Sequence, residues 1–274
     1  MEGLREFLEA RAQGDLLPWA AQQEASQRFG ATLASVERAA LECGILPARY
    51  QRNRETLSVK DQLRLFASRV AVIGCGGLGG YLIEETARLG VGHLVLVDPD
   101  VFEEHNLNRQ LYSSPAHLGR PKAEVARERV AEINPAVTVE AHQAAFSARN
   151  GAQLLSGCSA VLDGLDNNVT RHELALACRE IPAPLVHGAI AGWYGQVATQ
   201  LPTLELSPLL RCSSDRAKGV ETTLGNPSFT PAVIASLQVS ELAKVLLGRG
   251  APLSGKALFV NLLDMEFEVL RLQG

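Results

Sequence analysis

Cysteine is scarce and unpaired in this sequence of 274 residues. The five cysteines are odd in number and widely scattered, so they predict no disulfide framework and are typical of reduced thiols in the cytoplasm. No apolar run approaches the roughly 18 residues of a membrane span. Residues 1–6 lack the basic-then-apolar pattern of an export signal. We therefore expect a soluble cytoplasmic protein that has no membrane partner.

An excess of positive charge is also missing. The chain has 26 Lys and Arg against 30 Asp and Glu, and its net charge of −4 gives no general electrostatic case for nucleic acid. Residues 25–44 have the residue pattern of a helix-turn-helix. However, residues 1–60 carry eight basic and eight acidic residues, whereas a DNA-binding domain normally has a basic surface patch. The sequence favours a packing or dimerisation role for these helices over DNA binding.

The most informative feature that is present is a glycine-rich turn between a strand and a helix. The β-branched run Arg69–Ile73 enters the turn, and a helical pattern leaves it. Gly74 permits the tight turn, Gly76 lets backbone N–H groups approach phosphate, and Gly79 lets the helix pack on the strand. Asp98 ends the following strand, where a carboxylate can accept hydrogen bonds from ribose hydroxyls. This combination predicts a nucleotide-binding site.

Strands and helices alternate after this turn. We expect helices over 59–67, 78–89, 121–133, 149–156, 169–179 and 230–247, and strands over 69–73, 93–97, 137–141, 159–163, 184–188, 196–201, 257–262 and 266–272. The rhythm predicts an α/β fold with a doubly wound, mostly parallel sheet and an antiparallel C-terminal extension. Residues 1–47 are expected to form a small helical N-terminal appendage, and residues 48–274 the main domain. A linker begins at Leu46-Pro47, and residues 203–228 are expected to form a long loop.

Polar side chains follow several of these strands. Asp98, Arg109 and Asp166 all come after strands, so they should converge beyond the carboxyl ends, where ligands bind in such sheets. A nicotinamide cofactor has little use for extra cations, whereas ATP carries roughly four negative charges. Arg109 and Lys122 suit the triphosphate, and Asp166 suits a Mg²⁺ ion that keeps several waters. The alternatives are a solvated Arg109, an exposed Lys122, and Asp166 as the N-cap of the next helix.

A series of short motifs carries a family resemblance. They are Arg49-Tyr50-Gln51-Arg52, the turn from Gly74 to Gly79, Asp98-Pro99-Asp100, Asn106-Leu107-Asn108-Arg109-Gln110, Pro121-Lys122-Ala123, Ile133-Asn134-Pro135, Leu165-Asp166-Asn167 and Gly195-Gln196. In this order and spacing, residues 49 to 272 resemble the ThiF/MoeB/HesA adenylyltransferases, which are prokaryotic relatives of ubiquitin-activating enzymes.

The resemblance implies a Rossmann-like sheet and a homodimer. Each subunit would adenylate the C-terminal Gly-Gly carboxylate of a small ubiquitin-like sulfur-carrier protein. The implied catalytic residues are Arg109 and Lys122 at the phosphates, Asp166 at Mg²⁺, and Arg52 as an arginine finger that reaches into the partner subunit's site. The residues implied to bind the nucleotide are Gly74, Gly76, Gly77, Gly79, Asp98, Asp100, Asn106, Gln110 and Asn167, with Asp98 at the ribose.

Cysteine also marks where the chain departs from the family pattern. Many members carry two Cys-x-x-Cys pairs that bind zinc, whereas here Leu209 takes the first cysteine position beside Cys212, and there is no second pair. One thiol cannot make a tetrahedral cysteine site, so zinc is not expected. Residues 218–231, where thioester-forming relatives carry a cysteine, contain none. We expect chemistry that stops at the acyl-adenylate, with sulfur from another protein; Cys212 as a nucleophile is less favoured than Cys212 as a loop remnant.

The sequence thus predicts an ATP- and Mg²⁺-dependent adenylyltransferase. Its favoured substrate is a sulfur carrier for thiamine or for a molybdenum- or tungsten-type cofactor. One alternative is activation of a carboxylate on a modified tRNA base by a cyclising dehydratase. Another is a non-catalytic regulator that senses ATP and binds DNA through its helical appendage, and a nicotinamide oxidoreductase is least favoured. His187, at a strand end, is open to two interpretations, a residue that faces the site or a satisfied structural histidine.

Overall fold

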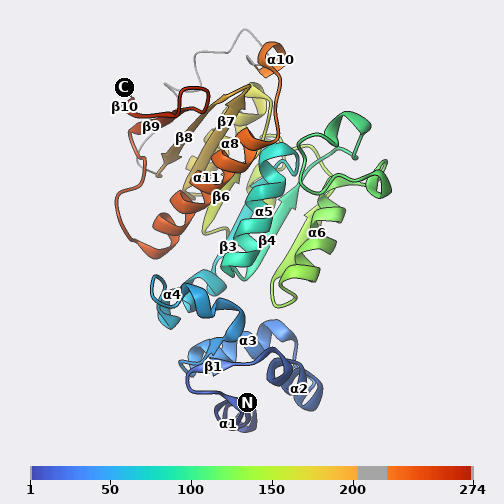
Figure 1. Ribbon diagram of the computed structural model, residues 1–274, viewed down its shortest axis with the longest axis vertical. Helices are drawn as coiled ribbons and strands as arrows, with labels where there is room; N and C mark the ends of the chain where they lie inside the picture. Colours follow the sequence, from blue (N-terminus) through green and yellow to red (C-terminus); the bar gives the residue numbers. More distant parts are fainter. Residues whose placement is uncertain (1, 203–220, 273–274) are drawn as a thin grey trace.

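A computed structural model describes residues 2–202 and 221–272 and contains one large central sheet (Figure 1). Its strands are β3 (Arg69–Ile73), β4 (His93–Val97), β5 (Thr138–His142), β6 (Ala160–Asp163), β7 (Leu185–Ala191), β8 (Tyr194–Gln200), β9 (Lys256–Asn261) and β10 (Glu266–Arg271). They lie in the order β10-β9-β8-β7-β6-β3-β4-β5. Strands β3 to β7 pair in parallel, and β8, β9 and β10 add antiparallel pairs. The predicted mostly parallel sheet with an antiparallel C-terminal extension is confirmed.

Helices cover both faces of this sheet. On one face lie α5 (Gly77–Leu89), α6 (Lys122–Ile133) and α11 (Phe229–Leu247), and on the other α7 (Gly151–Leu154) and α8 (Asn168–Glu180) (Figure 1). Alternate residues of each strand serve the two layers, as the two-residue period of a strand requires. Val70 and Val72 of β3 belong to the core under α5 and α11, whereas Ala71 and Ile73 belong to the core under α8.

The N-terminal residues form a separate group of helices at one end of the sheet (Figure 1). They are α1 (Glu2–Arg11), α2 (Trp19–Phe29) and α3 (Leu33–Glu42), which share a small core around Leu8, Leu17 and Val36. A 3₁₀ turn, η1 (Ala48–Asn53), leads from them to α4 (Val59–Ala67). The division at residue 47 into two domains stays a prediction.

The segment in which a linker is expected to begin, Leu46-Pro47, is built into the structure. Leu46–Pro47 pairs as β2 with β1 (Leu16–Leu17). Tyr50 in η1 is buried, and its hydroxyl donates to Glu37 Oε1 of α3 at 2.7 Å and accepts from Asn134 Nδ2 at 2.9 Å. Asn134 directly follows α6, so a polar junction joins the N-terminal helices to the main sheet.

Helix α11 differs from the expectation that no apolar segment approaches the length of a membrane span. It is the one helix among the described residues that is long and apolar enough, at 19 residues, to cross a membrane by length and composition. Half of the apolar window is buried inside the protein. Ile234, Ala235 and Leu242 of α11 lie in the core that it shares with α5, as expected for a helix that covers a central sheet.

Several element boundaries differ from the prediction. The helix expected over 149–156 is only the four residues of α7, and Gly157 beyond it has a left-handed φ of 69°. Strand β7 runs to Ala191 instead of ending at Gly188, because β8 pairs with it through Ala191↔Tyr194. Within the expected loop 203–228, residues 221–224 form a helical turn, and residues 203–220 lie outside the described residues.

Candidate nucleotide-binding site

A cleft of about 300 Å³ opens beyond the carboxyl ends of β3, β4 and β6. Because these strands are parallel and adjacent, the segments that follow them meet at one edge of the sheet. The residues predicted for the site that line the cleft are Gly74, Gly76, Gly77, Asp98, Asp100, Arg109, Gln110, Lys122, Asp166 and Asn167. The structure therefore brings Arg109, Lys122 and Asp166 together beside the glycine turn.

The glycine turn needs glycine at two positions for reasons of space. Gly74 has a φ of 92°, and a Cβ on it would lie 2.6 Å from the carbonyl oxygen of Gly164. A Cβ on Gly79 would lie 1.9 Å from the carbonyl oxygen of Gly74. Helix α5 begins directly after Gly76, so its unpaired N–H groups and partial positive charge lie at the cleft.

Asp98 holds the turn against the end of β4. Its carboxylate accepts from the backbone N–H of Cys75 at 2.6 Å and from that of Asp100 at 2.8 Å. Burial raises the pKa of the Asp98 carboxyl, and the hydrogen bond from Cys75 and the charge of Lys122 oppose that rise. One lone pair on each oxygen is thus used by the protein, and the remaining ones are left for ribose hydroxyls.

The two predicted phosphate ligands differ in how their charges are balanced. The Lys122 side chain is 8% exposed, and its Nζ lies 3.1 Å from Oδ2 of Asp100, a carboxylate that is 64% exposed. Arg109 donates to the carbonyl oxygen of His105 and to Oδ1 of Asn108, at 2.9 and 3.0 Å. Both of these acceptors are neutral. Within the described part of the chain, Arg109 therefore brings a positive charge that no carboxylate balances, and Lys122 brings one shared with Asp100.

Asp166 is presented to the cleft without a partner among the described residues, and it is exposed. The sequence left open that Asp166 caps the following helix. The cap of α8 is Asn167 instead, whose side chain accepts from the N–H groups of Val169 and Thr170 at 2.9 and 3.2 Å. The Asp166 carboxylate is therefore free for a cation, and Asn167 meets the cleft with its side-chain oxygen already engaged.

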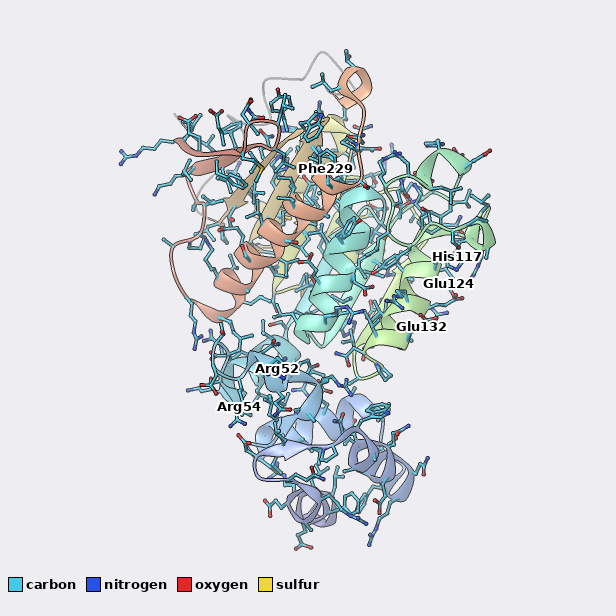
Figure 2. The ribbon with its side chains drawn as sticks, in the orientation of Figure 1. Arg52, Arg54, His117, Glu124, Glu132 and Phe229 are labelled. Carbon is cyan, nitrogen blue, oxygen red and sulfur yellow. The ribbon has the colours of Figure 1, made fainter. Side chains whose placement is uncertain are left out.

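Three predicted residues lie outside the lining of the cleft. Gly79 serves the close packing of α5 on the turn. Asn106 is buried and structural, since its Oδ1 accepts from Glu103 N–H at 2.9 Å. Arg52 lies beside Arg54 at the junction of the N-terminal helices with α4, whereas Phe229, near the cleft residue Asn226, lies toward the other end of the molecule (Figure 2). A role for Arg52 at the site therefore requires a second copy of the chain.

The cleft has further walls that the sequence did not single out: Phe146, Thr170, Arg171, Ile190 and Asn226. Ile190 lies in β7 past Gly188, where the sequence pattern predicted that the strand had ended. Thr170 and Arg171 lie in the first turn of α8. The prediction considered only polar residues that follow strands, so it did not include them. Arg171 is also part of a buried polar group with Asp163 and His187.

His187 is a satisfied structural histidine. It is 1% exposed, and its Nδ1 lies 2.7 Å from Asp163 Oδ2 while its Nε2 lies 3.3 Å from Gln196 Nε2. The amide nitrogen of Gln196 can only donate, so His187 Nε2 accepts and His187 Nδ1–H donates to Asp163. With both nitrogens occupied, His187 does not present a proton acceptor to the cleft.

The cleft residues suit a nucleoside triphosphate with a divalent cation. Two oxygens of the lining side chains, Gln110 Oε1 and Asn226 Oδ1, are buried without a hydrogen-bond partner among residues 2–202 and 221–272, and such atoms usually have one in a complete site. No group of three His, Cys, Asp or Glu side chains that could hold a metal occurs in the described part of the chain. Mg²⁺ does not need one, because it binds through one or two carboxylates together with phosphate oxygens and water. Cys212, on which the zinc prediction rests, lies outside the described residues.

A glycine turn at the head of α5, a carboxylate after β4 and cations around the cleft define an ATP-using enzyme of the doubly wound α/β class. The ThiF family model matches residues 50–274. The chain belongs to the ThiF family, and it is an ATP-dependent adenylyltransferase.

Curated relatives carry names of the same kind. The SAMP-activating enzyme E1 of Haloferax volcanii is 38% identical over 229 residues, which are 81% of this chain and 84% of that protein. The sulfur carrier protein adenylyltransferase of Thermus thermophilus is 36% identical, over 77% of this chain and 81% of that protein. The molybdopterin-synthase adenylyltransferase of Salmonella typhimurium is 36% identical, over 78% and 86%.

Solved structures share the fold at lower identity. Escherichia coli MccB with ATP has a TM-score of 0.69 at 19% identity, covering 82% of this chain and 70% of that one. The E. coli tRNA N6-threonylcarbamoyladenosine dehydratase TcdA, in complex with AMP, has a TM-score of 0.63 at 24% identity, covering 73% and 95%. These likenesses agree with the strand order and helix layers described above.

Proposed function

We propose that this protein adenylates the C-terminal carboxylate of a small ubiquitin-like sulfur-carrier protein in the cytoplasm. The names of the curated relatives support a sulfur carrier as the substrate, since one is a sulfur carrier protein adenylyltransferase and another a molybdopterin-synthase adenylyltransferase. Carriers of the thiamine or the molybdenum- or tungsten-cofactor type are the substrates proposed here.

The observation that carries this proposal is the meeting of Arg109, Lys122 and Asp166 around one cleft. A carboxylate that attacks the α-phosphorus of ATP approaches a strongly anionic group while pyrophosphate departs. Fixed positive charges that face the phosphates lower the cost of both events. Arg109 can supply its unbalanced charge at once, and Lys122 can exchange its bond with the exposed Asp100 for one with phosphate.

The other proposed roles follow the same geometry. Asp166 would hold Mg²⁺ together with phosphate oxygens, and the cation would neutralise charge on the triphosphate. Asp98 would accept from the ribose through its remaining lone pairs. Arg52 would act on the site of the partner subunit in a homodimer, which is supported by its exposed position without a partner among the described residues.

We further propose that the reaction ends at the acyl-adenylate and that another protein supplies sulfur. Residues 218–231 of the sequence contain no cysteine. Of the cysteines in the described residues, Cys75 and Cys178 are buried, and burial raises the pKa of both thiols. A thiol held protonated is a poor nucleophile, because the thiolate is the reactive form.

The experiment is exchange of labelled pyrophosphate into ATP by the purified chain. The probes are small ubiquitin-like proteins ending in Gly-Gly encoded in the same genome, each paired with a control that lacks the last glycine. Exchange with the intact carrier but not with its control supports the proposal. Exchange that depends on tRNA and falls steeply with salt points instead to the tRNA-modifying alternative. ATP binding without exchange, together with DNA binding, points to the regulator.

A further inference from the structure

The loop that carries Asp166 is clamped by buried charged side chains from two elements. Asp163, at the end of β6, accepts from the backbone N–H of Leu165 through Oδ1 at 2.9 Å. Arg171, in the first turn of α8, donates through its guanidinium to the carbonyl oxygen of the same Leu165. Both backbone groups of the residue before Asp166 are therefore fixed.

Further contacts hold the two clamping side chains themselves. Asp163 is 1% exposed, and its Oδ2 accepts from His187 at 2.7 Å, with Arg171 Nε at 3.6 Å. Arg171 also donates to Oδ1 of Asn168 at 3.2 Å. On the other side of Asp166, the side chain of Asn167 is committed to capping α8. The freedom that remains at Asp166 is mainly that of its own side chain.

This clamp is costly for stability alone. A buried carboxylate and guanidinium lose their hydration, and well-packed apolar residues of similar volume often serve a core as well or better. What the clamp does provide is a fixed backbone at the point where the exposed Asp166 carboxylate meets the cleft.

We propose that Arg171 and Asp163 are positioning residues that orient Asp166 toward the divalent cation of the bound nucleotide. This inference rests on the proposed function, because it assumes that Asp166 meets the cation. Partners that orient a metal-ligating carboxylate typically affect metal affinity by about 10- to 100-fold. Their loss should weaken binding of the cation and leave the nucleotide itself bound.

The test measures binding of Mn²⁺, by electron paramagnetic resonance, to the full chain with the ATP analogue AMPCPP, which cannot release pyrophosphate. We expect Arg171→Lys, which keeps the charge but loses the fork, to weaken Mn²⁺ binding about tenfold. Asp163→Asn should do the same, because an amide cannot accept from both Leu165 N–H and His187. Because Asp163 lies outside the lining of the cleft, Asp163→Asn should bind AMPCPP in EDTA within about twofold of the unsubstituted chain.

Two further variants make the outcome decisive. Arg129→Lys is the matched control, because Arg129 makes comparable bonds to Glu84 away from the cleft, and it should bind Mn²⁺ normally. Asp166→Asn should weaken Mn²⁺ binding at least as much as Arg171→Lys. If Asp166→Asn weakens Mn²⁺ binding while Arg171→Lys and Asp163→Asn bind Mn²⁺ normally, the positioning role is overturned. If Asp166→Asn itself binds normally, the metal role within the proposed function fails, and this inference fails with it. If Asp163→Asn loses Mn²⁺ binding and AMPCPP binding in EDTA to the same extent, the site is damaged in general, and the positioning role is also overturned.

Discussion

Lys122 illustrates how a single residue can be both stable in the fold and available to a ligand. A nearly buried ammonium group needs a partner, and Asp100 provides one from an exposed position. Because Asp100 remains solvated, opening this pair costs little compared with opening a fully buried one. A phosphate that reaches the cleft can therefore compete for Lys122. Arg109 adds a second cation, and its acceptors among the described residues are neutral.

At the residue scale we expect Lys122→Ala and Arg109→Ala each to lower the rate of pyrophosphate exchange by about 10²- to 10³-fold, if each stabilises developing charge. The control is Arg127→Ala on α6, whose exposed guanidinium pairs with Glu124 outside the cleft. Steady-state exchange kinetics with a saturating carrier measure the effect. Unchanged rates in both cleft variants would remove Arg109 and Lys122 from the mechanism.

The residue scale is also where prediction from sequence was least complete. The sequence identified Asp166 and Asn167 as a pair but did not decide which one caps α8. Capping depends on which oxygen reaches the free N–H groups, and that is set by the direction in which the chain leaves β6. His187 is similar, since its two ring partners lie 24 and 9 positions away along the chain.

The start of helix α4 is determined by residues that are close together in the sequence. Ser58 Oγ accepts from the N–H of Asp61 at 3.2 Å, and Asp61 Oδ2 accepts from the N–H of Ser58 at 2.9 Å, which completes a capping box. Asp61 also binds Arg249 at 2.6 Å, just beyond α11. Hydrogen bonds from Ser58 are the main cause that lowers the pKa of the Asp61 carboxyl.

At the element scale we expect Ser58→Ala to lower the free energy of unfolding by about 1 kcal/mol, because it leaves helix N–H groups without their cap. Ser58→Thr keeps the hydroxyl and should lose much less. Urea denaturation followed by circular dichroism measures both variants. Equal stabilities of the alanine and threonine variants would mean that the capping box does not stabilise α4.

Strand β7 shows an element that its own sequence did not delimit. The local pattern ended the strand at Gly188, since glycine is a poor strand residue. In the structure a Cβ on Gly188 would lie 2.2 Å from Gln238 Oε1, so any larger residue would have to displace the Gln238 side chain of α11. Pairing with β8 then carries the strand on to Ala191. A contact between distant segments thus overrides the local signal.

At the scale of the whole molecule, the N-terminal helices lie at one end of the main sheet (Figure 1). The residues that line the cleft follow the carboxyl ends of β3, β4 and β6, at the other end. The polar junction of Glu37, Tyr50 and Asn134 fixes η1 at the first of these ends, with Arg49 Nη1 3.2 Å from Glu37 Oε2. Arg52 belongs to the same turn and is exposed. It is thus held firmly at a place from which its own cleft is out of reach.

We therefore expect complementation between inactive subunits. Arg52→Ala and Lys122→Ala chains should each be nearly inactive, whereas a refolded equal mixture should recover about a quarter of the exchange activity if twofold dimers form at random. Size-exclusion chromatography checks that dimers have formed. A mixture that stays as inactive as its components would show that Arg52 does not act across a dimer.

The sequence by itself determined the glycine turn, the alternation of strands and helices, and most of the polar residues that border the cleft. These features are local, because periodicity, capping and turn formation depend on a few neighbouring residues. Only the tertiary structure decided which partners those residues have. Lys122 meets Asp100 across 22 positions, and Asp163 meets His187 across 24. The linker that became a buried junction has the same origin, since Tyr50 is enclosed by helices from both sides of it in the chain.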